Sequence, residues 1–141
     1  MNIKFDFTNK ETVILLTAIE YFEIFASYEV PVSEDEWDES SFNINNIDTE
    51  LDDVYSKLEI NSTPTLSISD VANLISALSV YHSIVLNNIK TTKKLKLSKS
   101  EKEKLLKNIF SLSQLLTASL KELAPNTPFI EYTLTPDTEY I

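Results

Sequence analysis

The chain has 141 residues, contains no glycine and no cysteine, and carries a formal net charge of −10. Without glycine, the phosphate-binding P-loop, the dinucleotide-binding fingerprint and the nucleophile elbow are excluded in their usual forms. All 12 basic residues are lysine, so no arginine can hold a phosphate or a carboxylate with two parallel hydrogen bonds.

The composition fits a single helical domain spanning residues 1–141, because 43% of the residues are apolar and can form one core. The negative charge disfavours direct contact with nucleic acid or with an anionic membrane, and it favours a basic protein partner. The chain has no cysteine and does not begin with a basic and then apolar leader, so we expect a cytoplasmic protein.

The first expected elements are a strand and a helix. Apolar residues alternate with polar ones over residues 2–7, which predicts a half-buried strand. A helix is expected over residues 8–28, and Thr8 and Glu11 at its start have the spacing of a capping box.

A strongly acidic segment separates the first helix from the second. Residues 29–46 show neither helical nor strand periodicity, and Pro31 interrupts them, so we expect an irregular connection. Apolar residues return to helical spacing from Ile47 to Leu58, which predicts a short helix over 48–59. Its first acids would lie near the positive end of the helix dipole, where negative charge is stabilising.

The longest stretch without charge, residues 71–89, predicts a buried central helix that Ser67 or Ser69 caps. Its asparagines and serines favour a protein interior over a bilayer, although the stretch is long enough to cross one. One side carries large apolar residues. The other side is a ridge of small side chains, made of Ala72, Ser76, Ser79 and Ser83. Another backbone can come close to such a ridge.

The C-terminal part begins with a lysine-rich segment, residues 90–107, and ends in an alternating tail. Ser100 and Glu103 have the spacing of a capping box for a last helix, which Pro125 ends. Beyond it, residues 130–134 alternate again, so we expect them to form a strand that pairs with the N-terminal strand.

Together these elements predict a mainly α fold. Four helices form a core around the helix at 70–90, and the two chain termini form a small β-sheet, so that a well-formed sheet would make the fold α+β. The chain shows no internal repeat and no low-complexity linker, so we expect no second domain.

Charge is unevenly distributed along the chain. Residues 1–70 hold 16 acidic residues and 3 lysines, whereas residues 71–141 hold 6 acidic residues and 9 lysines. The lysine-rich segment can neutralise the acidic one within the fold, or the acidic half can remain available to a basic partner. Both interpretations remain open from the sequence.

Candidate catalytic and metal-binding residues are few. His82 is the only histidine, and its position in an apolar helix favours a packed imidazole over a catalytic base. No positioned base accompanies any serine, threonine or tyrosine. The carboxylates at 34–39 do not have the spacing of a known calcium cage. We therefore expect no catalytic residue, no metal, no cofactor and no enzymatic activity.

Trp37 is the only tryptophan and lies in the sequence EDEWDE. Tryptophan is enriched among interface hot spots, and the flanking acids favour a surface position for the segment. Alternatively, the indole folds back and pins the connection to the core. The candidate partner-binding residues are the tryptophan, its acidic neighbours and the acids of the second helix: Glu34, Asp35, Glu36, Trp37, Asp38, Glu39, Asp48, Glu50, Asp52 and Asp53.

The sequence favours a non-enzymatic acidic binding or inhibitor protein that occupies a basic site on another protein, including a nucleic-acid-binding site whose ligand its carboxylates would mimic. Small inhibitors made by phages and mobile elements have this character. One alternative is an immunity protein that neutralises a basic toxin. Another is a homo-oligomeric structural or interaction module, in which a homodimer joins through the ridge of small side chains if that ridge is exposed.

Overall fold

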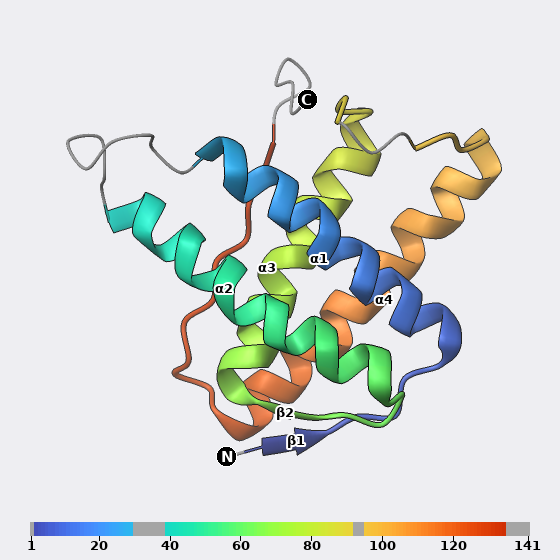
Figure 1. Ribbon diagram of the computed structural model, residues 1–141. Coiled ribbons are helices and arrows are strands. Elements are labelled where there is room, and N and C mark those ends of the chain that lie inside the picture. The colour runs from blue at the N-terminus through green and yellow to red at the C-terminus, as the bar shows by residue number, and fades with distance from the viewer. Residues whose placement is uncertain (1, 30–38, 92–94, 135–141) are drawn as a thin grey trace.

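Most of the described chain is helical. The computed structural model describes residues 2–29, 39–91 and 95–134, and it contains four α-helices and a two-stranded sheet within them (Figure 1). The expected mainly α fold with four helices and a small sheet is confirmed.

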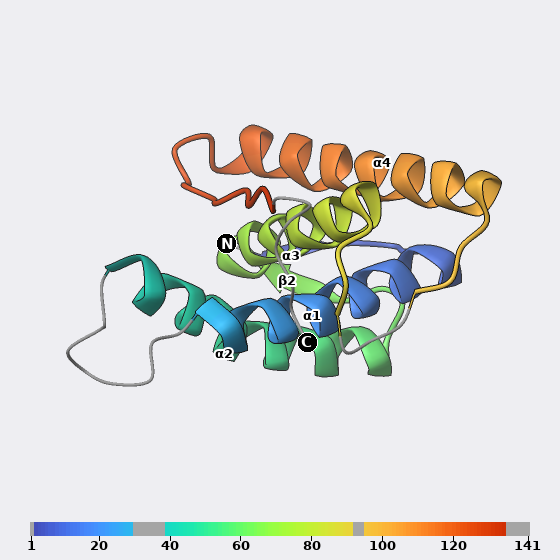
Figure 2. The same ribbon diagram turned by 90° about the horizontal axis from the view of Figure 1, so that it is seen from above.

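The four helices are arranged in three layers. Helices α1 (Asn9–Glu29) and α2 (Glu39–Ile60) lie side by side in one outer layer. Helix α3 (Ile68–Asn87) forms the middle layer, and α4 (Lys99–Leu123) forms the other outer layer (Figure 2). Helix α3 is therefore central, as the sequence predicts.

Helix α3 is apolar on nearly all sides because helices cover it on two opposite sides. Leu74, Ile75 and Leu78 have no exposed surface. The helix is long and apolar enough to cross a membrane, but 78% of its most apolar window is buried inside the protein. A core helix has these properties as well.

Both ends of α3 are capped, the first by side chains and the second by the backbone of Asn88. Ser67 Oγ accepts a hydrogen bond from the Asp70 amide at 3.0 Å, and Asp70 Oδ2 accepts one from the Ser67 amide at 3.0 Å. At the other end, Asn88 adopts the left-handed conformation, with φ of 52°. Asparagine tolerates this conformation better than most residues, so it takes the position that glycine usually occupies in a helix C-cap.

The predicted start of α1 is confirmed. The Thr8 amide donates to Glu11 Oε1 at 2.9 Å, and the Glu11 amide donates to Thr8 Oγ1 at 3.1 Å, which completes the capping box. On the inner side of α1, Tyr21 stacks on Tyr81 of α3 with ring centroids 5.2 Å apart.

Helix α2 begins earlier than its pattern suggests. We expected an irregular connection up to residue 46, but the helix begins at Glu39. Ile44 and Ile47 are both buried, so the apolar stripe of α2 extends further towards the N-terminus. Their burial outweighs the preference of Asn45 and Asn46 for turns.

The start of α4 also differs from the prediction. The capping box is formed by Ser98 and Glu101 rather than by Ser100 and Glu103. The Glu101 amide donates to Ser98 Oγ at 3.1 Å, and the Ser98 amide donates to Glu101 Oε1 at 3.2 Å. The two pairs have the same spacing, so the pattern alone placed the start of the helix two residues too late.

The small sheet joins different segments from those predicted. Strand β1 (Asn2–Lys4) pairs antiparallel with β2 (Thr65–Ser67), and Ile3 lies opposite Leu66. The pairing extends past the sheet, because the Phe5 amide donates to the Pro64 carbonyl at 3.0 Å. The C-terminal tail is not part of this sheet.

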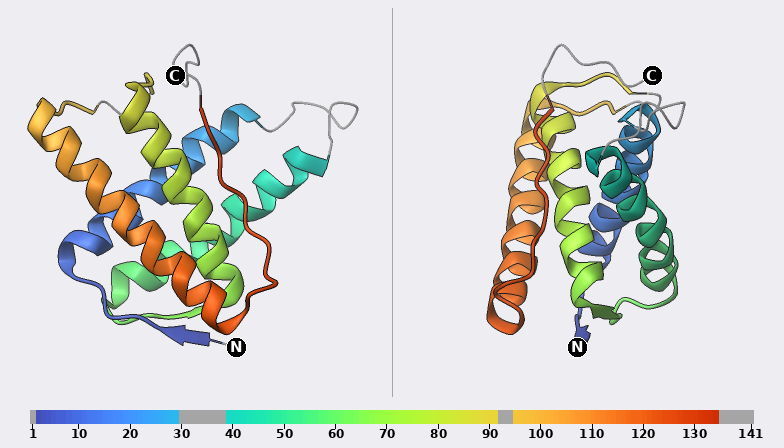
Figure 3. Two further views of the ribbon diagram at one scale, coloured as in Figure 1. Left: turned by 180° about the vertical axis from the view of Figure 1, so that it is seen from behind. Right: turned by 90° about the vertical axis from the view of Figure 1, so that its left-hand side faces the viewer.

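The tail instead runs as an extended chain along α3 (Figure 3). Four side chains on the ridge side of α3 bind its backbone, those of Ser76, Ser79, Ser83 and Asn87. Ser76 Oγ donates to the Ile130 carbonyl at 2.6 Å, and the Tyr132 amide donates to Ser79 Oγ at 2.8 Å. Asn87 Nδ2 donates to the Leu134 carbonyl at 2.9 Å.

The contacts span similar lengths along α3 and along the extended tail, so the two segments can run side by side. Residues 76 and 87 lie about 16 Å apart along a helix, and residues 130 and 134 lie about 13 Å apart along an extended chain. The ridge of small side chains does let another backbone come close, but that backbone belongs to the same chain. Ser76 is only 1% exposed, so the exposed ridge on which the homodimer interpretation depends is not present.

The central position of α3 can be tested with one substitution at two sites. Leu78→Asp places an unpaired charge in the buried layer and should lower the free energy of unfolding by more than about 4 kcal/mol. Leu115→Asp makes the same change on α4, where the side chain is 46% exposed, and should cost about 1 kcal/mol or less. Similar urea midpoints for the two variants would show that α3 is not the core helix.

The attachment of the tail can be tested through Tyr132. Its ring lies 5.0 Å from that of Phe25 and 5.8 Å from that of Phe22. Tyr132→Ala should cost about 2 kcal/mol and should speed amide hydrogen exchange in residues 129–134 more than in α3. Thr133→Ala, at an exposed neighbour, is the control and should change neither quantity. Unchanged exchange of the tail amides in Tyr132→Ala would contradict this account of its anchoring.

Candidate partner-binding surface

The predicted partner-binding residues fall into two groups. Glu34, Asp35, Glu36, Trp37 and Asp38 lie outside the described residues, and so does the side chain of Glu39, the first residue of α2. The choice between an interface role and a core-pinning role for Trp37 therefore stays a prediction. The second group comprises four acids of α2 that the structure describes: Asp48, Glu50, Asp52 and Asp53.

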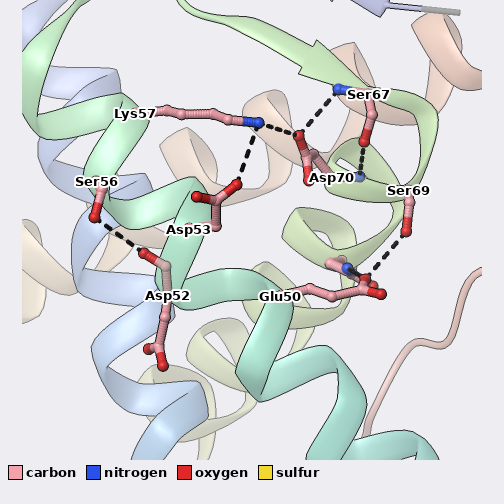
Figure 4. A network of polar contacts seen from close by, with 9 residues as sticks. Glu50, Asp52, Asp53, Ser56, Lys57, Ser67, Ser69 and Asp70 are labelled. Carbon is pink, nitrogen blue, oxygen red and sulfur yellow. Dashed lines mark hydrogen bonds and ion pairs between the residues drawn. The ribbon is translucent and has the colours of Figure 1, made fainter.

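These four acids do not share one face of α2. Asp48 and Asp52 are one helical turn apart and repel each other electrostatically. Asp48 also interacts with the charge of Glu23 of α1. Glu50 and Asp53 lie on the side of the helix that faces the start of α3 (Figure 4). Because the two sides have different neighbours, the two pairs of carboxylates have different roles.

Glu50 connects α2 to α3. Its Oε2 accepts a hydrogen bond from Ser69 Oγ at 3.1 Å and another from Asn73 Nδ2 (Figure 4). Asn73 is only 7% exposed, so its amide needs a partner inside the protein. Glu50 is therefore a structural residue, and its carboxylate is already engaged.

Lys57 partly neutralises the same side of α2. Its Nζ lies 3.1 Å from Asp70 Oδ2 and 3.5 Å from Asp53 Oδ2. The hydrogen bond to Asp70 raises the pKa of Lys57, which keeps the ammonium charged. The Asp70 side chain is 11% exposed and caps α3, so this ion pair fastens the end of α2 to the start of α3. The Asp53 side chain is 74% exposed, and its contact adds little stability.

The other side of α2 faces α1 and concentrates negative charge. We call Glu23, Asp48 and Asp52 the α1–α2 acidic edge. Burial, followed by the charges of Asp52 and Glu23, raises the pKa of Asp48 to about 6. Both ion pairs found within the described part of the chain use Lys57, so neither includes a residue of this edge.

The sequence did not assign Glu23 to the candidate site. Its spacing placed it on the polar side of the first helix, which the structure confirms, since Glu23 is exposed. Asp48 of α2 lies near Glu23 because of the way in which α1 and α2 pack against each other. The only sequence signal is the polar stripe itself, which does not indicate its neighbour.

The lysines of α4 lie far from the acids of α2 in the layered fold. Helix α4 is on one side of α3, and α2 is on the other (Figure 2). Lys99, Lys104 and Lys107 are exposed on α4. Among the described residues, the lysines of α4 thus form no ion pair with the acids of α2, and the helices of the two outer layers carry opposite net charge.

His82 lies half-buried on α3 in a groove of about 530 Å³ that α4 and the tail also line. Ser79 and Ser83, the nearest serines along the helix, bind the backbone of Tyr132. Their hydroxyls thus have a structural role. Within the part of the chain that the structure describes, no three histidine or acidic side chains are grouped so that they could hold a metal ion.

A comparison of the chain with protein-family models, with curated proteins and with solved structures finds no match.

Proposed function

We propose that the protein is a non-enzymatic binding protein whose acidic surface occupies a basic site on another protein. The α1–α2 acidic edge carries this proposal, because it gathers three carboxylates without an ion-pair partner among the described residues. A surface of one sign attracts a surface of the opposite sign over long distances, and it speeds association at low salt.

The layered fold supports this proposal because it separates the charges. The lysines of α4 lie on the opposite side of α3, so they do not cancel the negative electrostatic potential around the acids of α2. The segment 30–38 joins α1 to α2 in the chain, and it would add four acids and Trp37 to the same binding surface. In this proposal, carboxylates steer and orient the partner, and the indole supplies apolar contact.

Two biological roles would use such a surface. An inhibitor of the kind that phages and mobile elements encode would cover a nucleic-acid-binding site, whereas an immunity protein would cover a basic toxin. We favour the inhibitor because carboxylates can replace phosphates at a nucleic-acid site. The partner should be captured from a lysate of the source cell, or of its host, at low salt and be released at high salt. Capture that does not depend on salt would contradict an electrostatic interface.

The contribution of the α1–α2 acidic edge can be measured with two triple variants of equal charge. Glu23→Gln with Asp48→Asn and Asp52→Asn should slow association with the captured partner about tenfold at low salt and flatten its salt dependence. The control replaces three exposed acids of the α4 layer and the tail by glutamine: Glu103, Glu122 and Glu131. Equal effects of the two triples on stopped-flow association rates would show that only net charge matters and would refute a localised site.

Trp37 can be tested in the same complex. Trp37→Ala should weaken binding by about 2 kcal/mol, mainly through faster dissociation, because a buried aromatic anchor holds the bound state together. The circular dichroism spectrum and melting temperature of the variant should match those of the parent. Unfolding of Trp37→Ala would instead support the core-pinning role, and unchanged affinity of a folded variant would place the binding site elsewhere.

The α1–α2 acidic edge should also make stability depend on pH. The pKa of Asp48 is about 6 in the folded protein against 3.8 for an ordinary aspartate, so the folded protein binds more protons between these values. The stability contributed by Asp48 is therefore fully present below about pH 4 and is lost as the pH rises through about 6.

Replacement of Asp48 should remove this loss. Asp48→Asn should be about 1 kcal/mol more stable than the parent at pH 7, after allowance for solvent screening of a half-buried group, and about equally stable at pH 4. Asp53→Asn, which removes an exposed partner of Lys57, should give no such gain. Urea unfolding at both pH values measures the difference, and an Asp48→Asn variant that is less stable at pH 7 would contradict the like-charge account.

A further inference from the structure

We propose that a pocket lined by the end of α3, residues 88–91 and 95–97 and the start of α4 binds a small amphiphilic anion, with an anionic headgroup at three lysines and an apolar body against the floor. The pocket has a volume of about 410 Å³. Cavities of about 300–1,000 Å³ hold small organic ligands. This inference does not rest on the proposed partner-binding function, because the pocket shares no residue with the α1–α2 acidic edge.

The floor of the pocket is apolar. Ile84 and Val85 come from the end of α3, Ile89 follows its C-cap, and all three are buried. Leu97 is half-buried in the connection, and Leu95 is 39% exposed at the opening. These side chains can cover a hydrocarbon segment, and each methylene that they bury adds to the affinity.

The lysines make the pocket cationic. Lys90, Lys96 and Lys102 line it, and none of the described lining residues is acidic. This is unusual in a chain with a net charge of −10. Three ammonium groups near one opening repel each other, so an anion placed between them would be stabilised.

Lys102 makes its hydrogen bond to a neutral side chain. Its Nζ donates to Asn88 Oδ1 at 3.1 Å, and the amide oxygen carries no formal charge. Lys102 also lies in the first turns of α4, near the positive end of the helix dipole. A cation is disfavoured and an anion is favoured at this end.

The polar groups deeper in the pocket add no negative charge. Burial raises the pKa of the Tyr21 hydroxyl, a hydrogen bond with Thr91 acts in the opposite direction, and the charge of Glu20, which does not line the pocket, adds to the rise, so Tyr21 stays protonated. Tyr21 and Thr91 both line the pocket and are neutral. The combination of an apolar floor with lysines in the lining selects a ligand with one anionic end and one apolar end.

The experiment uses decanoate as the probe and the full-length protein at a decanoate concentration below micelle formation. Decanoate should bind saturably by isothermal titration calorimetry, and binding should weaken as salt is added. Decanol tests the apolar body alone, acetate tests the headgroup alone, and decyl phosphate tests whether a phosphate can replace the carboxylate. Decanol and acetate should each bind at least about tenfold more weakly than decanoate, and equal binding of decanol would overturn the proposal.

Matched variants locate the binding site. Lys96→Gln with Lys102→Gln should weaken decanoate binding about tenfold, whereas Lys99→Gln with Lys107→Gln makes the same charge change outside the pocket and should alter it less than about twofold. Leu95→Glu places a carboxylate at the exposed rim and should abolish binding in a protein that melts like the parent. Equal effects of the two lysine pairs, or unchanged binding to Leu95→Glu, would overturn the assignment of this pocket.

Discussion

The rest of the structure depends on the burial of α3 between two layers of helices. Because helices cover α3 on two sides, the few polar groups that it carries must find partners within the protein. Ser67 and Asp70 satisfy amides at its start, and Asn88 ends its last turn. The serines of its ridge contact the backbone of the tail. The position of the C-terminal tail is thus a consequence of the polar groups that α3 retains.

Local patterns predicted the features that local physics decides. The central helix lacks charge from residue 71 to its end, and the Thr8 capping box needs only residues three apart, so both could be predicted. The beginning of α2 could not, because it depends on the burial of Ile44 in the core rather than on the turn preference of its neighbours. The tail could not either, since its alternation suits a sheet edge and a ridge of serines equally well.

The candidate site shows the same division. The sequence locates the acids of α2 and their excess over lysine, but it does not show which of them are engaged. Glu50 bonds to the buried Asn73 and Asp53 shares Lys57, whereas Asp48 faces Glu23 of another helix. These differences depend on how helices pack against one another. A helical stripe indicates which residues share a side, but it does not identify the element that covers that side.

The fold keeps two surfaces of opposite charge apart, and this separation has an energetic cost. Asp48 is half-buried beside other acidic side chains. Placing these acids next to the lysines of α4 would have stabilised both layers, but the two groups lie on opposite sides of α3. Proteins tolerate such local conflicts mainly where a surface serves another molecule, because a partner of opposite charge relieves the repulsion when it binds. The lysines around the pocket at the start of α4 repel one another in the same way, and a bound anion would relieve that repulsion. In our two proposals the sites therefore take ligands of opposite charge, and neither ligand needs to displace the other.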